Sequence, residues 1–215
     1  MAVSTIREKM AILSEKFSEG SLSKNVFQQY LTEVSQLVKL NQEGLDKAES
    51  LLNQFKSVDS QLVNNPVESI NLAQFMQEVK NSVGGVLGSH QLSIDVAPNI
   101  NIQVIKESLW QVLYQLIENS VIHGFKTIDY GTIQITAMVK DNSLYIDYQD
   151  DGIGLDEEGQ QKLFEPFYTN KRAKKNLGLG LTMVVNLLNN VLHGKISLMP
   201  SPLGVRYEIV LPAST

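Results

Sequence analysis

Apolar residues in the first part of the chain recur at alternating intervals of four and three, the seam pattern of a coiled coil. The seam of the longer predicted helix consists of Phe27, Leu31, Val34, Val38, Asn41, Leu45, Ala48, Leu52 and Phe55. A shorter helix before it repeats the spacing at Ile6, Met10, Leu13 and Phe17. Residues 19–23 between them have turn composition, so we predict an antiparallel helical hairpin. A hairpin alone cannot bury both faces of its helices, and we therefore expect two copies to pair in a four-helix bundle.

After residue 69 the heptad pattern gives way to a mixture of strand and helix signals. Residues 143–148 alternate between polar and apolar side chains, which is typical of a strand with one buried face. The apolar residues around Leu109 and Leu113 have helical spacing, and His123-Gly124 is a helix-ending pair. The stretch between the two patterns contains Asn-Asn-Pro, which is typical of a linker. We predict a hairpin over residues 1–58, a linker over 59–69 and a second domain over 70–215.

The composition narrows the class of protein. With 215 residues and 43% hydrophobic content, the chain can form one medium-sized core beside a hairpin. It has no cysteine, which excludes disulfides and cysteine-bound metals. The net charge of −5 argues against nucleic acid as a partner. No apolar run approaches the roughly 20 residues that cross a bilayer, and no signal peptide is apparent. We therefore expect a cytoplasmic module, with any membrane anchor upstream.

The segment Asp150-Asp151-Gly152-Ile153-Gly154 follows the predicted strand and suggests a nucleotide site. A carboxylate at a strand end can accept a hydrogen bond from an exocyclic amine, so Asp150 is the candidate that recognises adenine. The two glycines lack Cβ atoms and let the backbone lie close to a flat ring. A hydrogen bond to a charged group contributes about 1.5–3 kcal/mol, which selects a base but does not hold a whole nucleotide. The same pattern is also found in ordinary hairpin turns.

Phosphate contacts could come from the segment that follows. A basic cluster, which contains Lys171 and Arg172, precedes Gly178-Leu179-Gly180 at the start of a predicted helix. The free N–H groups of a helix N-terminus carry about half a positive elementary charge and favour anions. The alternative interpretation of the basic cluster is an ordinary solvated surface.

A third group of polar residues lies on the helix that ends at His123-Gly124. Gln115 and Asn119 are four residues apart and share one face, with Glu118 beside them. Amide and carboxylate oxygens are hard ligands that suit Mg²⁺, whose other ligands are water and phosphate. Considered alone, this face is also typical of any amphipathic helix.

Taken in order, four motifs resemble the boxes of the GHKL ATPase superfamily and, within it, the catalytic domain of sensor histidine kinases. They are QLIENSVIHG, DDGIGL, FEPF and GLGLT, and the resemblance covers about residues 70–212. It implies an α+β fold of the Bergerat type, a sandwich in which helices cover one face of a mixed sheet. It also implies that ATP and Mg²⁺ bind between the first motif's helix and a lid.

Matched to those boxes, the residues receive roles that the resemblance implies. Asp150 would accept from the adenine amine, and Asn119 would ligate Mg²⁺ beside Glu118, which could orient the nucleophile or the metal. His123 would lie at the end of the motif helix, at the edge of the nucleotide site. The remaining nucleotide-site residues are Gly152, Gly154, Gly178, Leu179 and Gly180, which would shape the pocket and lid, Phe164 and Phe167, which would anchor the lid, and Lys171 and Arg172, which would contact phosphate.

Some positions depart from the family's pattern. Gln115 stands where relatives of the gyrase type carry a glutamate, and an amide cannot act as a general base for water, which weighs against a dedicated hydrolase. Asn176-Leu177 replaces a Gly-Thr pair in the lid, and Gly204-Val205 lies where relatives often have Gly-Thr. These departures predict a modest affinity for ATP.

The first seventy residues resemble the dimerisation hairpin of histidine kinases, but the box that carries the phosphorylated histidine is absent. His90, His123 and His193 do not lie in such a context. We therefore interpret the chain as a fragment of a longer sensor kinase. The predicted function is transfer of the γ-phosphoryl group of ATP to an upstream histidine, and then to an aspartate on a response regulator receiver domain. The fragment itself is expected to bind Mg-ATP without autophosphorylation.

Two other functions stay open at this point. One is a protein serine kinase of the same superfamily, whose phosphorylated product would be stable in acid, unlike phosphohistidine. The other is a dimerisation module whose pocket has degenerated and binds no nucleotide.

Overall fold

A computed structural model describes residues 2–165, 168 and 178–213. The chain divides into two compact units, Met1–Phe55 and Lys56–Thr215, and each is described by itself.

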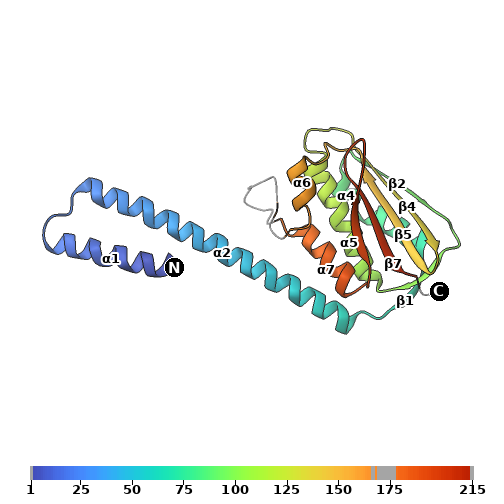
Figure 1. Ribbon diagram of the computed structural model, residues 1–215, viewed down its shortest axis with the longest axis horizontal. Coiled ribbons are helices and arrows are strands. Elements are labelled where there is room, and N and C mark those ends of the chain that lie inside the picture. The colour runs from blue at the N-terminus through green and yellow to red at the C-terminus, as the bar shows by residue number, and fades with distance from the viewer. Residues whose placement is uncertain (1, 166–167, 169–177, 214–215) are drawn as a thin grey trace. The chain divides into compact units, whose positions relative to one another are not determined.

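The first unit is a helical hairpin, as the apolar spacing predicts (Figure 1). It is formed by α1 (Ala2–Ser18) and by the first part of α2 (Lys24–Asn64). Gly20 has φ +66° and lets the chain leave α1, and the N–H of Ser21 donates to the carbonyl of Lys16 at 3.0 Å. Glycine adopts this left-handed backbone without the cost that a Cβ atom adds. An ion pair between Lys9 and Glu33 joins the two helices.

The predicted seam of α2 is largely exposed within a single chain. Leu31, Val38 and Leu45 are 48%, 52% and 65% exposed. Val34 and Asn41 of the seam are partly buried, as are Tyr30 and Leu37 on the neighbouring stripe, the side of α2 that carries Glu33. The short α1 therefore covers a stripe beside the seam and leaves most of the seam residues open.

The connection between the two predicted domains is shorter than the predicted linker. Helix α2 continues to Asn64, and strand β1 (Glu68–Asn71) begins after residues 65–67. The contact boundary between the units lies inside α2, between Phe55 and Lys56. The division into residues 1–58, 59–69 and 70–215 stays a prediction.

The second unit is built on a mixed five-stranded sheet in the order β2-β4-β5-β7-β6. Its strands are β2 (Gln91–Val96), β4 (Thr132–Lys140), β5 (Ser143–Asp150), β6 (Lys195–Met199) and β7 (Arg206–Pro212). Strands β2 and β4 are parallel, and the other neighbours are antiparallel. A separate pair joins β1 to β3 (Asn101–Val104). The strand predicted over residues 143–148 is therefore confirmed, and it lies at the centre of the sheet.

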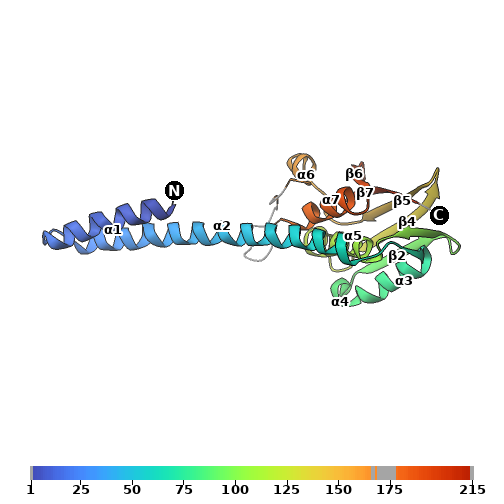
Figure 2. The same cartoon turned by 90° about the horizontal axis from the view of Figure 1, so that it is seen from below.

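Helices cover one face of this sheet (Figure 2), as the predicted sandwich requires. They are α3 (Leu72–Ser82), α4 (Gly84–Leu87), α5 (Lys106–Asn119), α6 (Glu157–Lys162) and α7 (Gly180–Asn190). The core includes Leu113 and Leu116 from α5 and Ile146 from β5, all with no exposed surface. Alternation along β5 buries every second residue up to Asp150, so the strand delivers a carboxylate to the interior. Within the described part of the chain, no helix is long and apolar enough to span a membrane.

Candidate nucleotide-binding site

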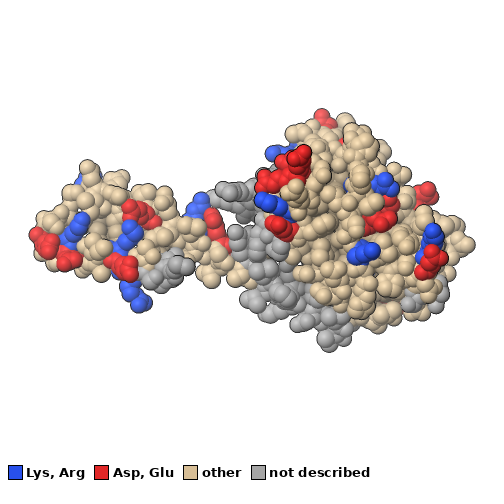
Figure 3. Space-filling view, in the orientation of Figure 1, with Lys and Arg blue, Asp and Glu red and all other residues tan. Residues whose placement is uncertain are grey.

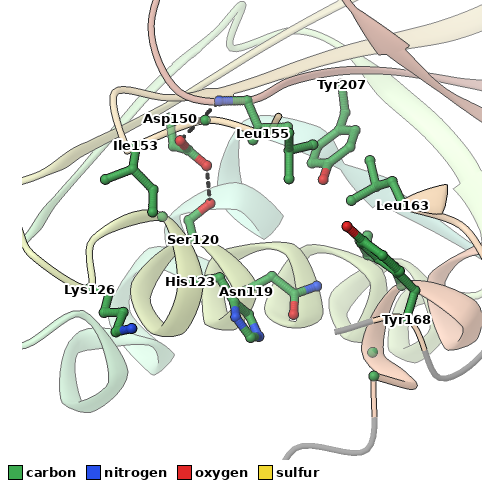
Figure 4. Close-up of a pocket in the computed structure, with 16 residues that line it drawn as sticks. Asn119, Ser120, His123, Lys126, Asp150, Ile153, Leu155, Leu163, Tyr168 and Tyr207 are labelled. Carbon is green, nitrogen blue, oxygen red and sulfur yellow. Dashed lines mark hydrogen bonds between the residues drawn. The ribbon is translucent and has the colours of Figure 1, made fainter. Parts of the chain in front are cut away.

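A cavity of about 1010 Å³, open mouth included, lies between the C-terminal end of α5, the end of β5 and the start of α7 (Figure 4). Its lining residues are Asn119, Ser120, His123, Gly124, Lys126, Asp150, Ile153, Gly154, Leu155, Leu163, Tyr168, Gly178, Gly180, Leu181, Val205 and Tyr207. The lining is mostly apolar with a few polar groups, which is typical of small-molecule sites. The structure thus brings together Asn119 and His123 of one motif, Asp150 and Gly154 of a second, and Gly178 and Gly180 of a third.

Asp150 is the buried charge of this cavity, with 3% of its surface exposed. Its Oδ1 atom accepts hydrogen bonds from the backbone N–H of Gly152 at 3.0 Å and of Val205 at 3.1 Å. Its Oδ2 atom accepts from the hydroxyl of Ser120 at 2.5 Å, within the range of a charge-assisted bond. A buried carboxylate is stable only with such partners. The predicted adenine-recognising group is therefore held rigidly from three sides.

Ser120 is in turn bonded to Tyr148, whose hydroxyl oxygen lies 2.8 Å from its own. Tyr148 is fully buried on β5, and burial raises the pKa of its hydroxyl well above the ordinary value. Sequence reasoning assigned neither residue to the site. The alternation along β5 was the available signal for Tyr148, since it lies two residues before Asp150 and faces the same side. For Ser120 the signal was its place directly after Asn119.

Two glycines allow the backbone to approach this carboxylate. Gly204 has φ +60°, and a Cβ atom there would lie 2.0 Å from the carbonyl oxygen of Asp150 and 2.4 Å from its Oδ1. A Cβ atom on Gly152 would lie 2.8 Å from the backbone of Gly124. Real Cβ atoms do not come this close to backbone, so both positions require glycine. In the sequence Gly204 agrees with the family's pattern and only Val205 departs from it, and the structure shows why the glycine itself is needed.

The loop that carries Val205 is held by the strand that follows it. Arg206, the first residue of β7, forms a fork with Asp147 of β5 through bonds of 2.6 Å and 3.1 Å. The carboxylate raises the pKa of Arg206. Both side chains are partly exposed, and such pairs contribute about 0–1 kcal/mol. Arg206 is paired with Gln149 in the antiparallel register of β5 and β7. The residue before Arg206, Val205, therefore lies beside the residue after Gln149, Asp150.

The predicted helix end at His123-Gly124 is a π-helical turn, η1 (Ser120–Gly124), that continues directly from α5. The N–H of Phe125 donates to the carbonyl of Ser120 at 2.8 Å, a bond to the fifth preceding residue. Such turns are frequent at functional sites because they redirect side chains at a helix end. Here the turn places Ser120, His123 and Gly124 along one wall of the cavity.

Helix α7 closes the cavity from the other side. Its N-cap residue is Leu179, whose side chain cannot accept a hydrogen bond from the first turn. A Cβ atom on Gly180 would lie 2.8 Å from Oε1 of Gln115 and 3.3 Å from Oδ1 of Asn119, so both amides lie against this helix start. The first turn of α7 can therefore offer N–H groups to an anion beside two amide side chains.

The amide of Asn119 is a candidate ligand for a metal ion in this cavity. No cluster of three or more His, Cys, Asp or Glu side chains that could hold a metal is present in the described ranges. A Mg²⁺ ion would therefore take most of its ligands from water and phosphate, as is common for this ion. The amide of Asn119 lines the cavity, and its buried Nδ2 atom has no hydrogen-bond partner. That N–H group could donate to a ligand, whereas the amide oxygen is the atom that could ligate a cation.

Other predicted site residues lie outside the cavity lining. The carboxylate of Glu118 lies 3.5 Å from the hydroxyl of Tyr114 and 3.4 Å from Nε2 of Gln115. Phe164 is partly buried against the core, with its ring centroid 6.3 Å from that of Tyr207. Leu179 is buried at the start of α7. The predictions for Phe167, Lys171, Arg172, Asn176 and Leu177 fall outside the described residues.

The described surface carries charges of both signs. On the face shown in Figure 3, acidic and basic side chains are interspersed over the described residues. Within the cavity itself, Lys126 is the one lysine or arginine among the described lining residues.

A mixed sheet with helices on one face and a buried carboxylate at a strand end, walled by glycines, defines a nucleotide-binding α/β sandwich. Residues 105–215 match the family described as histidine kinase-, DNA gyrase B-, and HSP90-like ATPase. The chain belongs to this ATPase family. The resemblance to histidine kinase catalytic domains and the Bergerat-type fold are thus confirmed.

Curated relatives match parts of the chain. The anti-sigma F factor of Clostridium acetobutylicum is 31% identical over 77 residues, which is 36% of this chain and 52% of that protein. The signal transduction histidine-protein kinase BaeS of Escherichia coli K12 is 30% identical over 127 residues, 57% of this chain and 26% of that protein. The match therefore spans about half the length of the first relative and about a quarter of the second.

Solved structures show the same fold at low identity. The histidine kinase AdeS of Acinetobacter baumannii matches with a TM-score of 0.60 and 18% identity, covering 100% of this chain and 96% of that chain. The ATP-binding domain of PrrB from Mycobacterium tuberculosis matches with a TM-score of 0.56 and 23% identity, covering 70% of this chain and all of that one. The first match includes the hairpin as well as the sandwich.

Proposed function

We propose that the second unit binds Mg-ATP and transfers its γ-phosphoryl group to a histidine, from which the group passes to an aspartate on a response regulator. The observation that carries this proposal is the succession of a helical hairpin and an ATPase sandwich, because a histidine kinase structure matches that arrangement over the whole chain. The proposal agrees with the similarity to BaeS. The acceptor histidine is proposed to lie outside this chain.

The polar groups of the cavity each have a positional task in this proposal. Asp150 accepts from the exocyclic amine of the base, and Asn119 holds Mg²⁺, which offsets phosphate charge when bound. The first turn of α7 would donate N–H groups to phosphate oxygens. Phosphoryl transfer needs mainly positioning and charge neutralisation from the protein, which this set of groups provides.

The cavity is poor in carboxylates that could activate water for hydrolysis. Asp150 is the one carboxylate among the described lining residues, and three donors already occupy its oxygens. Gln115, which lies near the start of α7, has no basic oxygen that could activate water. A hydrolase needs a base within reach of the attacking water. Among the described lining residues, His123 is the one other side chain that could act as such a base.

A serine kinase is the second candidate, and the similarity to anti-sigma F factors favours it. That similarity covers a little over a third of this chain, whereas the hairpin is part of the match to AdeS. The two functions differ in product, because phosphohistidine is labile in acid and phosphoserine is stable.

The test begins with calorimetric titration of Mg-ATP into the parent chain, Asp150→Asn and Asp151→Asn. The neighbouring Asp151 is a matched control, since it is exposed and accepts from the N–H of Thr132 at 2.7 Å. We expect ATP affinity to fall by about tenfold or more in Asp150→Asn, because a hydrogen bond to a charged group is lost, and to be retained in Asp151→Asn. Absence of binding by the parent chain would favour a module with a degenerate pocket.

Transfer is then tested with γ-labelled ATP after a histidine-bearing helix is joined upstream. Acid-labile label on that helix supports the histidine kinase, and acid-stable label supports the serine kinase. The present chain is expected to stay unlabelled. Label that survives replacement of His90, His123 and His193 together would overturn the assignment of the acceptor to an upstream histidine.

A further inference from the structure

The hydrogen bonds around Asp150 have only one consistent arrangement of protons. An ionised carboxylate has no proton to donate, so Ser120 must direct its single hydroxyl proton to Oδ2 of Asp150. Its oxygen lies 2.8 Å from the hydroxyl oxygen of Tyr148, and that bond can form only if Tyr148 is the donor. The protons therefore run in one direction, from Tyr148 to Ser120 to Asp150.

This direction determines what Asp150 offers to a ligand. A carboxylate has about four lone-pair positions, and Gly152, Val205 and Ser120 occupy three of them. About one acceptor position remains on a side chain that lines the cavity. Ser120 has no proton left for a ligand, because its only one is committed to Asp150. The buried end of the cavity can thus accept a hydrogen bond from these groups but cannot donate one.

We propose that Tyr148 and Ser120 are specificity-determining positioning residues, which make the cavity select a purine with a 6-amino group over one with a 6-oxo group. The inference rests on the proposed nucleotide site but is independent of the phosphoryl acceptor. A 6-amino group donates to the free position on Asp150. A 6-oxo group brings lone pairs to a place where no donor is available, and an unpaired buried acceptor is costly.

Removal of the first donor should relax this selection. Without the hydroxyl of Tyr148, the oxygen of Ser120 loses the incoming bond that polarises its own O–H toward Asp150. The bond from Ser120 to Asp150 then weakens, and the proton of Ser120 can be exchanged at a lower cost for a bond to a 6-oxo group. The phenyl ring of Tyr148→Phe keeps the buried shape on β5. Tyr145→Phe is the matched control, because Tyr145 lies three residues earlier on the same strand, is only partly buried and is absent from the cavity lining.

The experiment measures the Kd of three Mg-nucleotides by calorimetry: ATP, inosine triphosphate with a 6-oxo group, and purine riboside triphosphate with hydrogen at position 6. The proteins are the parent chain, Tyr148→Phe, Ser120→Ala and Tyr145→Phe. Ratios of Kd within one protein cancel any difference in the folded fraction, so a partly unfolded variant still gives a usable result.

In the parent chain, ATP is expected to bind about tenfold or more tightly than purine riboside triphosphate, with inosine triphosphate weakest. In Tyr148→Phe the preference for ATP over inosine triphosphate is expected to fall by about three- to tenfold. Ser120→Ala is expected to lower the preference for ATP over purine riboside triphosphate, because Asp150 loses one of its three fixed donors. Tyr145→Phe is expected to leave every ratio unchanged.

The possible failures are distinct. A parent chain that binds ATP, with ratios that stay within twofold in both Tyr148→Phe and Ser120→Ala, overturns the role of the two hydroxyls alone. A parent chain that binds inosine triphosphate as tightly as ATP also overturns it. Binding of none of the three nucleotides contradicts the proposed nucleotide site together with this inference. Loss of phosphoryl transfer with ATP selection intact contradicts only the kinase proposal.

Discussion

A methyl group at residue 204 tests how closely the backbone packs around the buried carboxylate. In Gly204→Ala the new Cβ atom would start 2.0 Å from the carbonyl oxygen of Asp150, about 1 Å inside the closest approach that Cβ atoms show. That oxygen belongs to the backbone and cannot move aside as a side-chain end would, so the loop that carries Gly204 must move. The movement breaks the 3.1 Å bond from the N–H of Val205 to Asp150. Loss of a bond to a charged group costs about 1.5–3 kcal/mol. An alanine at φ +60° adds about 1–2 kcal/mol.

We therefore expect Gly204→Ala to lower the free energy of unfolding by about 2.5–5 kcal/mol. It should also raise the Kd for Mg-ATP at least tenfold, because the carboxylate that recognises the base loses a fixed donor. Urea unfolding and calorimetry measure the two effects. The control is Gly88→Ala, where φ is +59° but no atom lies within 4 Å of the added Cβ. At Gly88 ψ is −114°, so that variant should lose about 1–3 kcal/mol of stability from backbone strain alone and should bind ATP normally. Equal stability losses in the two variants, with equal ATP affinity, would refute the close approach.

Further predictions concern the helix start, the buried tyrosines and the hairpin. Gly180→Ala should change stability by less than about 1 kcal/mol, since its Cβ meets flexible amide ends and alanine favours a helix, yet weaken ATP binding in calorimetry. Burial raises the pKa of Tyr148 and Tyr207, so the folded chain binds more protons than the unfolded chain above about pH 10. The free energy of unfolding should therefore fall by up to about 1.4 kcal/mol per pH unit for each tyrosine as the pH rises beyond 10; a flat profile in urea titrations would contradict the burial. Leu31→Glu on the exposed seam should shift sedimentation of a proposed dimer toward monomer, whereas Gln36→Glu on the opposite side of α2 should not; a parent chain that stays monomeric at high concentration would contradict the dimer.

The exposed seam gives the proposed dimer its physical basis. Apolar side chains at Leu31, Val38 and Leu45 are about half or more exposed to solvent in one chain. Contiguous exposed apolar surface of this kind is typical of protein interfaces. A second copy would bury these residues in the four-helix arrangement that the heptad spacing predicts.

The sequence by itself determined the elements whose physics is local. The four-three spacing predicts the hairpin, because side chains at that spacing share one side of a helix. The alternation over residues 143–148 predicts β5, because strand side chains alternate between two faces. The glycines after Asp150 indicate a close backbone approach. The mixed sheet with helices on one face followed from the resemblance of four motifs, since no local pattern contains strand order.

Only the tertiary structure decided which groups surround the carboxylate. Val205 and Gly204 lie more than fifty residues after Asp150, and the antiparallel register of β5 and β7 brings them beside it. Ser120 reaches it from a π-helical turn thirty residues earlier in the chain. The direction of the protons from Tyr148 through Ser120 to Asp150 depends on which atoms lie within hydrogen-bond distance. Such distances are set by the packing of whole elements, so no spacing along the chain contains them.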